Sequence, residues 1–290
     1  MYVLENEQAR ATVQIRGAEL SSFVRKDFGN LEYIWPAEPS VWARHAPVLF
    51  PIVGRLPENQ YQHAGRTYTL SQHGFARDLD FTLVRHTPAE LVLELRDTAA
   101  TRQQYPFAFQ LLISYRLAGP MLTVGWEVHN PGTEELLFSI GAHPAFRCPL
   151  LPGEVFEDYA FVFDQPVSFS RHLLRGGLLT GETEPVLHQA TELPLSYELF
   201  SRDALVLQNF DFTHLTLRSQ RSGRAVRMRF EGFPFLGLWT KEPGAPFVCI
   251  EPWHGVASLV GPPGELVDKK GILTLAPEQE YATSYSITLE

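Results

Sequence analysis

The feature that most constrains the fold of this chain is a two-residue alternation of apolar and polar side chains. Every odd position from 107 to 117 is apolar, whereas most even positions are small or polar. Residues 122–128 alternate as well, and the turn Asn130-Pro-Gly-Thr133 separates them from an apolar run at 136–140. Pro presets one backbone angle of such a turn and Gly accepts a positive one. The pattern therefore predicts half-buried antiparallel strands.

Short apolar runs of the same kind recur from one end of the sequence to the other. Helical periodicity is weak, and only residues 97–104 and 196–202 favour one or two helical turns. Because each strand has one face to bury, two large sheets that cover each other satisfy the pattern, and the fold class is expected to be all-β. No linker interrupts the pattern, which favours a single domain over residues 1–290. Further strands are predicted at 12–15, 67–70, 81–85, 91–95, 160–163, 204–207, 215–217, 225–230, 235–239, 247–250, 272–275 and 281–289.

Charge and cysteine content narrow the classes of partner and compartment. A formal net charge of −9 argues against a nucleic-acid or an anionic-membrane surface. Cys148 and Cys249 match no zinc or redox spacing, so we expect two buried free thiols in a reducing cytoplasm. The first residues carry early acidic groups and lack the apolar region of a signal peptide, and no run is long enough to span a bilayer.

Four short motifs, far apart in the sequence, each place an ionisable side chain beside or close to Gly or Pro. Those neighbours restrict the backbone and leave the side chain little freedom to be misplaced. Together the motifs offer an acid, a base and fixed donors. They are Pro51-Ile-Val-Gly-Arg55, Gln72-His-Gly-Phe-Ala-Arg77, Gly141-Ala-His-Pro-Ala-Phe146 and Cys249-Ile-Glu-Pro-Trp-His-Gly255.

At these motifs the chain resembles the galactose mutarotase-like family, the aldose 1-epimerases. It is most similar to a bacterial branch that also resembles the hexose-6-phosphate epimerases. The motifs at 141–146 and 249–253 are the most specific, and the match extends over essentially the whole chain. The resemblance implies an antiparallel β-supersandwich and interconversion of the α and β anomers of an aldose. It implies a small-molecule sugar as the partner, no cofactor and no metal.

Mutarotation opens and recloses a hemiacetal ring, so it needs one acid and one base that can exchange roles. Glu251 follows the apolar run 247–250 and precedes Pro252, which restricts its backbone to extended conformations. The resemblance assigns it the role of base. His143, between Gly141 and Pro144, is assigned the role of acid, since an imidazole can give or take a proton near neutral pH. A buried ion pair for Glu251 and a core histidine for His143 are the structural alternatives.

Five further residues are expected to hold the sugar. His73 precedes Gly74, which lets the backbone approach a ligand closely, and Arg55 offers a rigid fork of donors. Asp203 matches a substrate-binding aspartate of the family over a short stretch only, and Trp239 and Trp253 are possible platforms for a sugar face. A solvated histidine, a surface ion pair, a loop carboxylate and core aromatic rings are the corresponding structural interpretations.

Other functions fit parts of the same pattern. A glycosidase would use two carboxylates, such as Glu251 and Asp203, but has little need of both His143 and His73. A non-catalytic carbohydrate-binding protein would have no reason to combine Glu251 with His143. A hexose-6-phosphate 1-epimerase would need several cations around the phosphate. Arg77 is followed by Asp78 and Asp80, which can pair with it, so a neutral hexose is the preferred substrate.

Overall fold

The computed structural model describes residues 1–241 and 244–290. Every ladder between its named strands is antiparallel within these residues, as the alternation predicts. The described residues contain no helix with the length and apolar character needed to cross a membrane.

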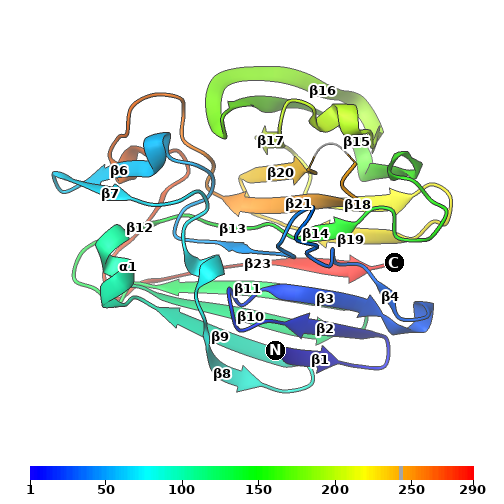
Figure 1. The fold of residues 1–290 in the computed structure, drawn as a ribbon, viewed down its shortest axis with the longest axis horizontal. Coiled ribbons are helices and arrows are strands. Elements are labelled where there is room, and N and C mark those ends of the chain that lie inside the picture. The colour runs from blue at the N-terminus through cyan, green and yellow to red at the C-terminus, as the bar shows by residue number, and fades with distance from the viewer. Residues whose placement is uncertain (242–243) are drawn as a thin grey trace.

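One large curved sheet forms most of the molecule (Figure 1). Its strands lie in the order β5-β13-β21-β20-β17-β15-β18-β19-β23-β11-β10-β9-β8, with β14 paired to β21 and β16 paired to β15. Their bounds are β5 Val48–Leu49, β8 Thr82–His86, β9 Glu90–Arg96, β10 Gln110–Ala118, β11 Met121–His129, β13 Ile140–Ala142, β14 Ala145–Arg147, β15 Tyr159–Arg175, β16 Leu178–Pro194, β17 Leu205–Gln208, β18 His214–Ser219, β19 Ala225–Arg229, β20 Phe235–Trp239, β21 Phe247–His254 and β23 Glu280–Leu289.

A second sheet packs against the end of the large sheet that contains β9 to β11. It consists of β1 Tyr2–Glu5, β2 Ala9–Val13, β3 Leu20–Arg25 and β4 Leu31–Glu32. Ala11 of β2 and Phe23 of β3 share one apolar core with Ile113 and Trp126, and all four are fully buried. The Tyr115 hydroxyl crosses the interface and donates to the Ala18 carbonyl over 2.6 Å. Two sheets thus bury each other's apolar faces, which is the sandwich expected from the alternation.

Short elements complete the chain. Two pairs of strands lie apart from the main sheets: β6 Gln60–His63 with β7 Arg66–Thr69, and β12 Leu136–Phe138 with β22 Leu273–Leu275. The α-helix α1, Ala99–Gln104, lies within the predicted segment 97–104 and begins with a capping box from Thr98. The second predicted helix is a 3-10 turn, Tyr197–Phe200.

Seven strands of the structure were not predicted from the alternation. β16 is the clearest case, because most of its 17 residues are exposed or half-buried. It forms a long arch with β15 at the top of Figure 1. β1, β3, β4, β5, β6 and β14 were not expected either. They are six residues or shorter, and a short strand carries too few residues for a period.

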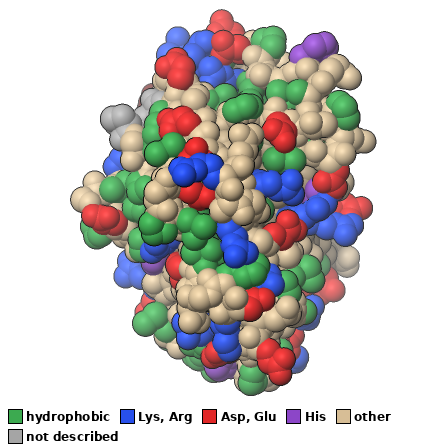
Figure 2. Space-filling model, turned by 90° about the vertical axis from the view of Figure 1, so that its right-hand side faces the viewer, with side chains coloured by type: hydrophobic (Ala, Val, Ile, Leu, Met, Phe, Trp, Pro, Cys, Tyr) green, Lys and Arg blue, Asp and Glu red, His purple; other side chains and the backbone are tan. Residues whose placement is uncertain are grey.

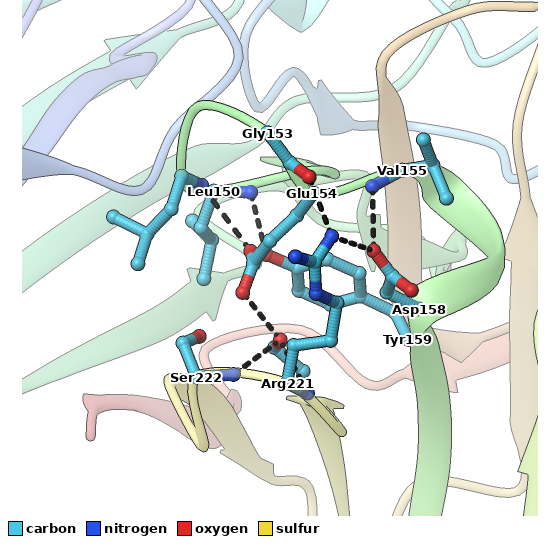
Figure 3. Close-up of polar contacts among 10 residues, drawn as sticks. Leu150, Gly153, Glu154, Val155, Asp158, Tyr159, Arg221 and Ser222 are labelled. Atoms are coloured by element: carbon cyan, nitrogen blue, oxygen red, sulfur yellow. Dashed lines mark hydrogen bonds and ion pairs between the residues drawn. The ribbon is translucent and has the colours of Figure 1, made fainter.

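A polar network fixes the loop that leads into β15 (Figure 3). The Tyr159 hydroxyl donates to the Glu154 carboxylate and accepts from the Leu150 amide over 2.7 Å. The Ser219 hydroxyl donates to the same carboxylate over 2.6 Å, which ties the loop to β18. The network satisfies a buried backbone donor that would otherwise be costly to leave unpaired.

The surface mixes both signs of charge. On the face shown in Figure 2, acidic and basic side chains are interspersed rather than gathered into a block of one sign. Both cysteines are buried and free, as expected.

Candidate active site

The site depends on an interrupted strand that pairs with β21. β13 and β14 both pair with β21, and their register is the same: Gly141 lies opposite Trp253, and Ala145 lies opposite Cys249. That shared register places His143, in the gap between the two strands, opposite Glu251. The Ile250 amide donates to the Pro144 carbonyl, so the chain stays close to β21 across the gap. Nε2 of His143 and Oε2 of Glu251 are 3.2 Å apart.

The sequence predicts a strand over residues 247–250 that ends just before Glu251, but the observed strand runs through this residue. β21 continues to His254, and all eight of its residues are buried. Val248 and Ile250 face the main core, while Cys249 and Trp253 belong to smaller clusters on the opposite face. Glu251 shares that second face because side chains alternate along a strand. Since both faces are apolar, periodicity does not reveal which one carries the site.

Two glycines beside Glu251 and His143 make room for the indole of Trp253. Gly237 lies opposite Glu251 on β20. A Cβ on Gly237 would lie 2.4 Å from the indole of Trp253, and one on Gly141 would lie 2.6 Å from the same ring. The indole is therefore seated over two glycines, and its Nε1 donates to the Ala142 carbonyl over 3.1 Å. This orients Trp253 as a wall of the site.

Aromatic rings enclose His143. Trp42 stacks on its imidazole with ring centroids 5.0 Å apart, and Trp239 meets it edge-on at 5.6 Å. Trp42 lies outside the four motifs, and no sequence signal distinguished it from a core tryptophan. Only 9% of the surface of His143 is exposed, and Nδ1 is buried without a hydrogen-bond partner.

His73 is held by its backbone as well as its ring. His73 and Gly74 both have positive φ angles, and a Cβ on Gly74 would lie 2.3 Å from the Phe50 carbonyl oxygen. The Gly54 amide donates to Nδ1 of His73 over 3.1 Å, which leaves the ring proton of the neutral imidazole on Nε2. That nitrogen lies 3.2 Å from the Gln72 side-chain amide. The His73 ring meets the His143 ring edge-on, with centroids 5.8 Å apart.

Burial determines the ionisation of these groups. It lowers the pKa of His143 to about 3 and lowers the pKa of His73 well below its usual value. Burial also raises the pKa of Glu251 well above its usual value, and the charge of Asp203 adds to this effect. In the free protein, burial therefore shifts both Glu251 and His143 toward their neutral forms.

A cavity of about 410 Å³ opens in front of this pair, a size within the usual range for small-molecule sites, roughly 300–1,000 Å³. Six of the seven residues predicted from the sequence line it: His73, His143, Asp203, Trp239, Glu251 and Trp253. Asp203 is exposed, has a φ of 75°, and caps its own turn by accepting from the Ala204 amide. Residues that the sequence analysis did not place in the site complete the lining: Trp42, Gly54, Gln72, Arg77, Leu174, Gly177, Ala204, Val206, Lys241, Val256 and Ala257.

Arg55 is the predicted residue that does not line the cavity. Its guanidinium donates to the Gly176 carbonyl over 3.0 Å. Gly176 and Gly177 form the turn between β15 and β16, and Gly177 lines the cavity. Arg55 thus holds the tip of the long hairpin at the cavity rim, and its contact with a sugar stays a prediction.

Arg77 lies deeper than a surface arginine. Its Nη2 donates to the Gln72 carbonyl over 2.7 Å, and its Nε lies 3.8 Å from the Asp78 carboxylate. Nε is buried without a hydrogen-bond partner, and burial lowers the pKa of Arg77 to about 10. The proposed pairing with Asp78 is present at long range, while Asp80 instead forms a backbone bridge with Arg16.

A buried lysine clamps two walls of the cavity together. Lys269 donates from Nζ to the Val53 carbonyl over 3.1 Å and to the Val256 carbonyl. These carbonyls adjoin Gly54 and Ala257, which touch so closely that a Cβ on Gly54 would lie 2.4 Å from the Ala257 Cα. The charge of Lys269 also contributes to the lowered pKa of His73. Local sequence patterns do not predict this role for Lys269, because the Val53 and Val256 carbonyls come together only in the folded chain.

Within residues 1–241 and 244–290, one group of side chains has the composition of a metal site. His143, Cys249 and Glu251 each offer one ligand atom, and the three atoms lie within 4.8 Å of one another. Local spacing in the sequence does not reveal this group, because His143 is far from Cys249 and Glu251 along the chain.

Comparison with known proteins identifies the family of this chain. The model of the aldose 1-epimerase family matches residues 1–274, and the chain belongs to that family. The chain is 35% identical to the chromosomal LacX protein of Lactococcus lactis, over 99% of this chain and 98% of the relative. It is 28% identical, over 89% of this chain and 84% of the relative, to a Salmonella typhimurium protein named provisionally as a glucose-6-phosphate 1-epimerase.

Solved structures show the same fold. A galactose mutarotase related enzyme from Lactobacillus acidophilus superposes with a TM-score of 0.94 at 34% identity, covering 100% of this chain and 97% of the other. A galactose mutarotase-like protein from Lactobacillus casei gives 0.93 at 30% identity, with both chains fully covered. The expected all-β, galactose mutarotase-like fold is therefore confirmed.

The burial of Lys269 predicts that this residue makes a pH-dependent contribution to the free energy of unfolding. Burial lowers the pKa of Lys269 from 10.5 to about 7. Between these values the unfolded chain binds this proton more tightly than the folded chain, so this group's contribution to stability rises with pH from about 7 to 10.5. Lys269→Met should remove that slope in the free energy of unfolding, measured by urea titration across this range. Lys270→Met, at the exposed neighbour, serves as the control; parallel curves for wild type and Lys269→Met would contradict the assignment.

Proposed function

We propose that this protein interconverts the α and β anomers of a neutral aldohexose by acid–base catalysis, with Glu251 and His143 as the reacting groups. The observation that carries the proposal is their 3.2 Å separation on one wall of the cavity. Both groups are buried, and Oε2 of Glu251 and Nδ1 of His143 have no hydrogen-bond partner. Buried polar groups are normally satisfied, so a polar ligand is the natural partner for them.

The reaction needs one shared proton on the pair. In ring opening, ionised Glu251 takes the proton of the anomeric hydroxyl while protonated His143 gives one to the ring oxygen. This leaves Glu251 protonated and His143 neutral beside the open aldehyde. Rotation about the bond to the next carbon and the reverse proton transfers then close the ring on the other face. Every step conserves protons and uses no cofactor.

The resting ionisation of the site matches the open-chain stage of this cycle. Burial favours neutral forms of both groups, which are also the forms that face the neutral aldehyde. Ring opening starts from the charged arrangement, which differs only by one proton moved between Glu251 and His143. Sugar hydroxyls that donate to the carboxylate stabilise that arrangement and replace the water lost on burial.

The remaining groups position the sugar. We assign Nε2–H of His73 as a donor and the exposed carboxylate of Asp203 as an acceptor for sugar hydroxyls. Trp239 and Trp42 present ring faces and edges beside His143. We assign Arg55 an indirect role, in which it holds the tip of the β15–β16 hairpin at the rim of the cavity. The indole of Trp253 forms one wall of the cavity.

A neutral hexose fits better than a phosphorylated one. Arg77 and Lys241 are the cations that line the cavity within the described residues. Arg77 is engaged by the Gln72 carbonyl and Asp78, and Lys241 donates to the Val41 carbonyl. Asp203 and Glu251 are acidic groups in the same cavity, whereas phosphate binding usually uses several free cations or a helix N-terminus. The Salmonella relative keeps the phosphorylated substrate as the second candidate.

Replacing the reacting groups should separate catalysis from binding. Glu251→Gln keeps the shape and removes the proton affinity, so anomer exchange should fall by about two to four orders of magnitude, the usual contribution of a general base. His143→Asn should fall similarly. NMR exchange spectroscopy measures the rate, and sugar titration followed by tryptophan fluorescence should show that binding persists. Wild-type exchange in Glu251→Gln would remove Glu251 from the mechanism, whereas a wild-type protein that binds sugar without any exchange would favour a carbohydrate-binding role.

The pH dependence of kcat/KM should be a broad bell. Activity requires the form of the pair that holds one proton. Activity should fall at acid pH, where the pair takes up a second proton. Burial lowers the pKa of His143 to about 3, so this acid limb moves to lower pH. Activity should fall at alkaline pH, where the last proton is lost, and this limb moves up with the raised pKa of Glu251. Polarimetry corrected for buffer-catalysed exchange checks this; a rate that keeps rising with pH would exclude a protonated pair.

Substrate choice can be tested by direct competition. Glucose and galactose should exchange anomers faster than glucose 6-phosphate at matched concentration, because the cavity cations are already engaged. Arg77→Ala should change the two rates by a similar factor if Arg77 is structural. A clear preference for the phosphate that Arg77→Ala abolishes would reverse the assignment.

A further inference from the structure

The buried thiol of Cys249 has no part in the mechanism above, yet it lies beside both reacting groups. Cys249 and Glu251 are two residues apart on β21, so their side chains share the face that bears the cavity. His143 lies opposite Glu251, in the gap between β13 and β14. A nitrogen, a sulfur and an oxygen ligand therefore converge from β21 and this gap, within 4.8 Å of one another.

The distances suit a small tetrahedral cation. Zinc binds His nitrogen and carboxylate oxygen at about 2.0–2.2 Å, which separates two such ligands by about 3.3 Å in tetrahedral geometry. Nε2 of His143 and Oε2 of Glu251 are already 3.2 Å apart. The sulfur needs to approach by at most roughly 1.2 Å to reach its own bonding distance of about 2.3 Å, which rotation about the Cα–Cβ bond of Cys249 can supply.

The carboxylate oxygen that would bind the cation also lacks a hydrogen-bond partner. Glu251 is 1% exposed, and its Oε2 has no hydrogen-bond partner although it faces His143. A thiolate and a carboxylate together balance the charge of a divalent cation. The mixed donor set favours zinc over calcium or magnesium, which prefer oxygen ligands alone. Three protein ligands leave the fourth position to water from the cavity.

We propose that His143, Cys249 and Glu251 form an inhibitory site for one thiophilic divalent cation, represented by Zn²⁺. The inference rests on the proposed function for its inhibitory consequence, but the binding itself does not. The cation bonds to Nε2 of His143, to the carboxylate of Glu251 and to Sγ of Cys249, and the thiol proton and the proton shared by the pair pass to solvent. A cation held there occupies both reacting groups, so metal and sugar exclude each other. The cation is an inhibitor and takes no part in the reaction.

Cobalt offers a direct measurement of the binding. Protein freed of metal by dialysis against a chelator is titrated with Co²⁺ alone and followed by absorption. We expect one equivalent to give a thiolate-to-cobalt charge-transfer band in the near ultraviolet. Cys249→Ser should abolish the band and weaken binding at least about tenfold. Cys148→Ser, at the other buried cysteine, should retain both.

Saturating sugar should displace the cobalt band in the wild-type protein, a test that needs no variant. Should Cys249→Ser fold poorly by circular dichroism, Cys249→Ala, which leaves an apolar side chain among apolar neighbours, replaces it. No charge-transfer band in the wild type, or an unchanged band in a folded Cys249 variant, would overturn the proposed site.

The inhibitory consequence is measured by anomer exchange. Zn²⁺ should suppress the wild-type rate and raise the apparent KM for sugar, and chelator should restore the rate. The Cys249 variant should need at least about tenfold more Zn²⁺ for half-inhibition, relative to its own metal-free rate. Bound metal that leaves exchange unaffected would refute the inhibition. A wild type that binds Co²⁺ through Cys249 but shows no exchange with any aldose would refute the proposed function and leave the metal site standing.

Discussion

The site depends on one constraint, the unbroken register of two short strands against β21. β13 and β14 pair with β21 as though they were one strand, and the residues between them form a gap without losing alignment. That gap releases the His143 side chain from the ladder while keeping it opposite Glu251. A one-residue slip on either side would turn one of the two side chains to the main core. The glycines at 141 and 237 add to this constraint, because they leave room for the Trp253 indole beside the pair.

Burial of this pair then sets its chemistry. A carboxylic acid and an imidazole in water would be ionised and partly charged at neutral pH. In the wall of the cavity burial drives both toward their neutral forms, and Nε2 of His143 lies 3.2 Å from Oε2 of Glu251. Such a pair carries no separated charge when both groups are neutral. Moving a single proton from Glu251 to His143 converts it to the charged form. The same desolvation leaves polar atoms without partners, which a sugar hydroxyl or a metal ion can satisfy.

The cavity wall is held by backbone contacts rather than by side chains alone. Gly54 lies against Ala257, its amide orients the ring of His73, and Lys269 joins the carbonyls on either side. Arg55 extends the same segment to the turn of the β15–β16 hairpin. A change in the 53–55 segment therefore reaches a histidine, a second loop and the rim together.

The sequence by itself determined the class of fold and, through its resemblance to a known family, gave candidates for the site. Alternation identified β10, β11 and β23 closely, because a period of two is visible in their side chains. Motifs rich in Gly and Pro pointed to His73, His143 and Glu251, since restricted backbones beside ionisable groups are rarely needed for packing alone. Only the tertiary structure decided that β21 passes through Glu251, that Trp42 stacks on His143, and that Lys269 and Cys249 adjoin the site. These properties arise from contacts and desolvation between segments distant in the chain, and local patterns of side chains carry no information about either.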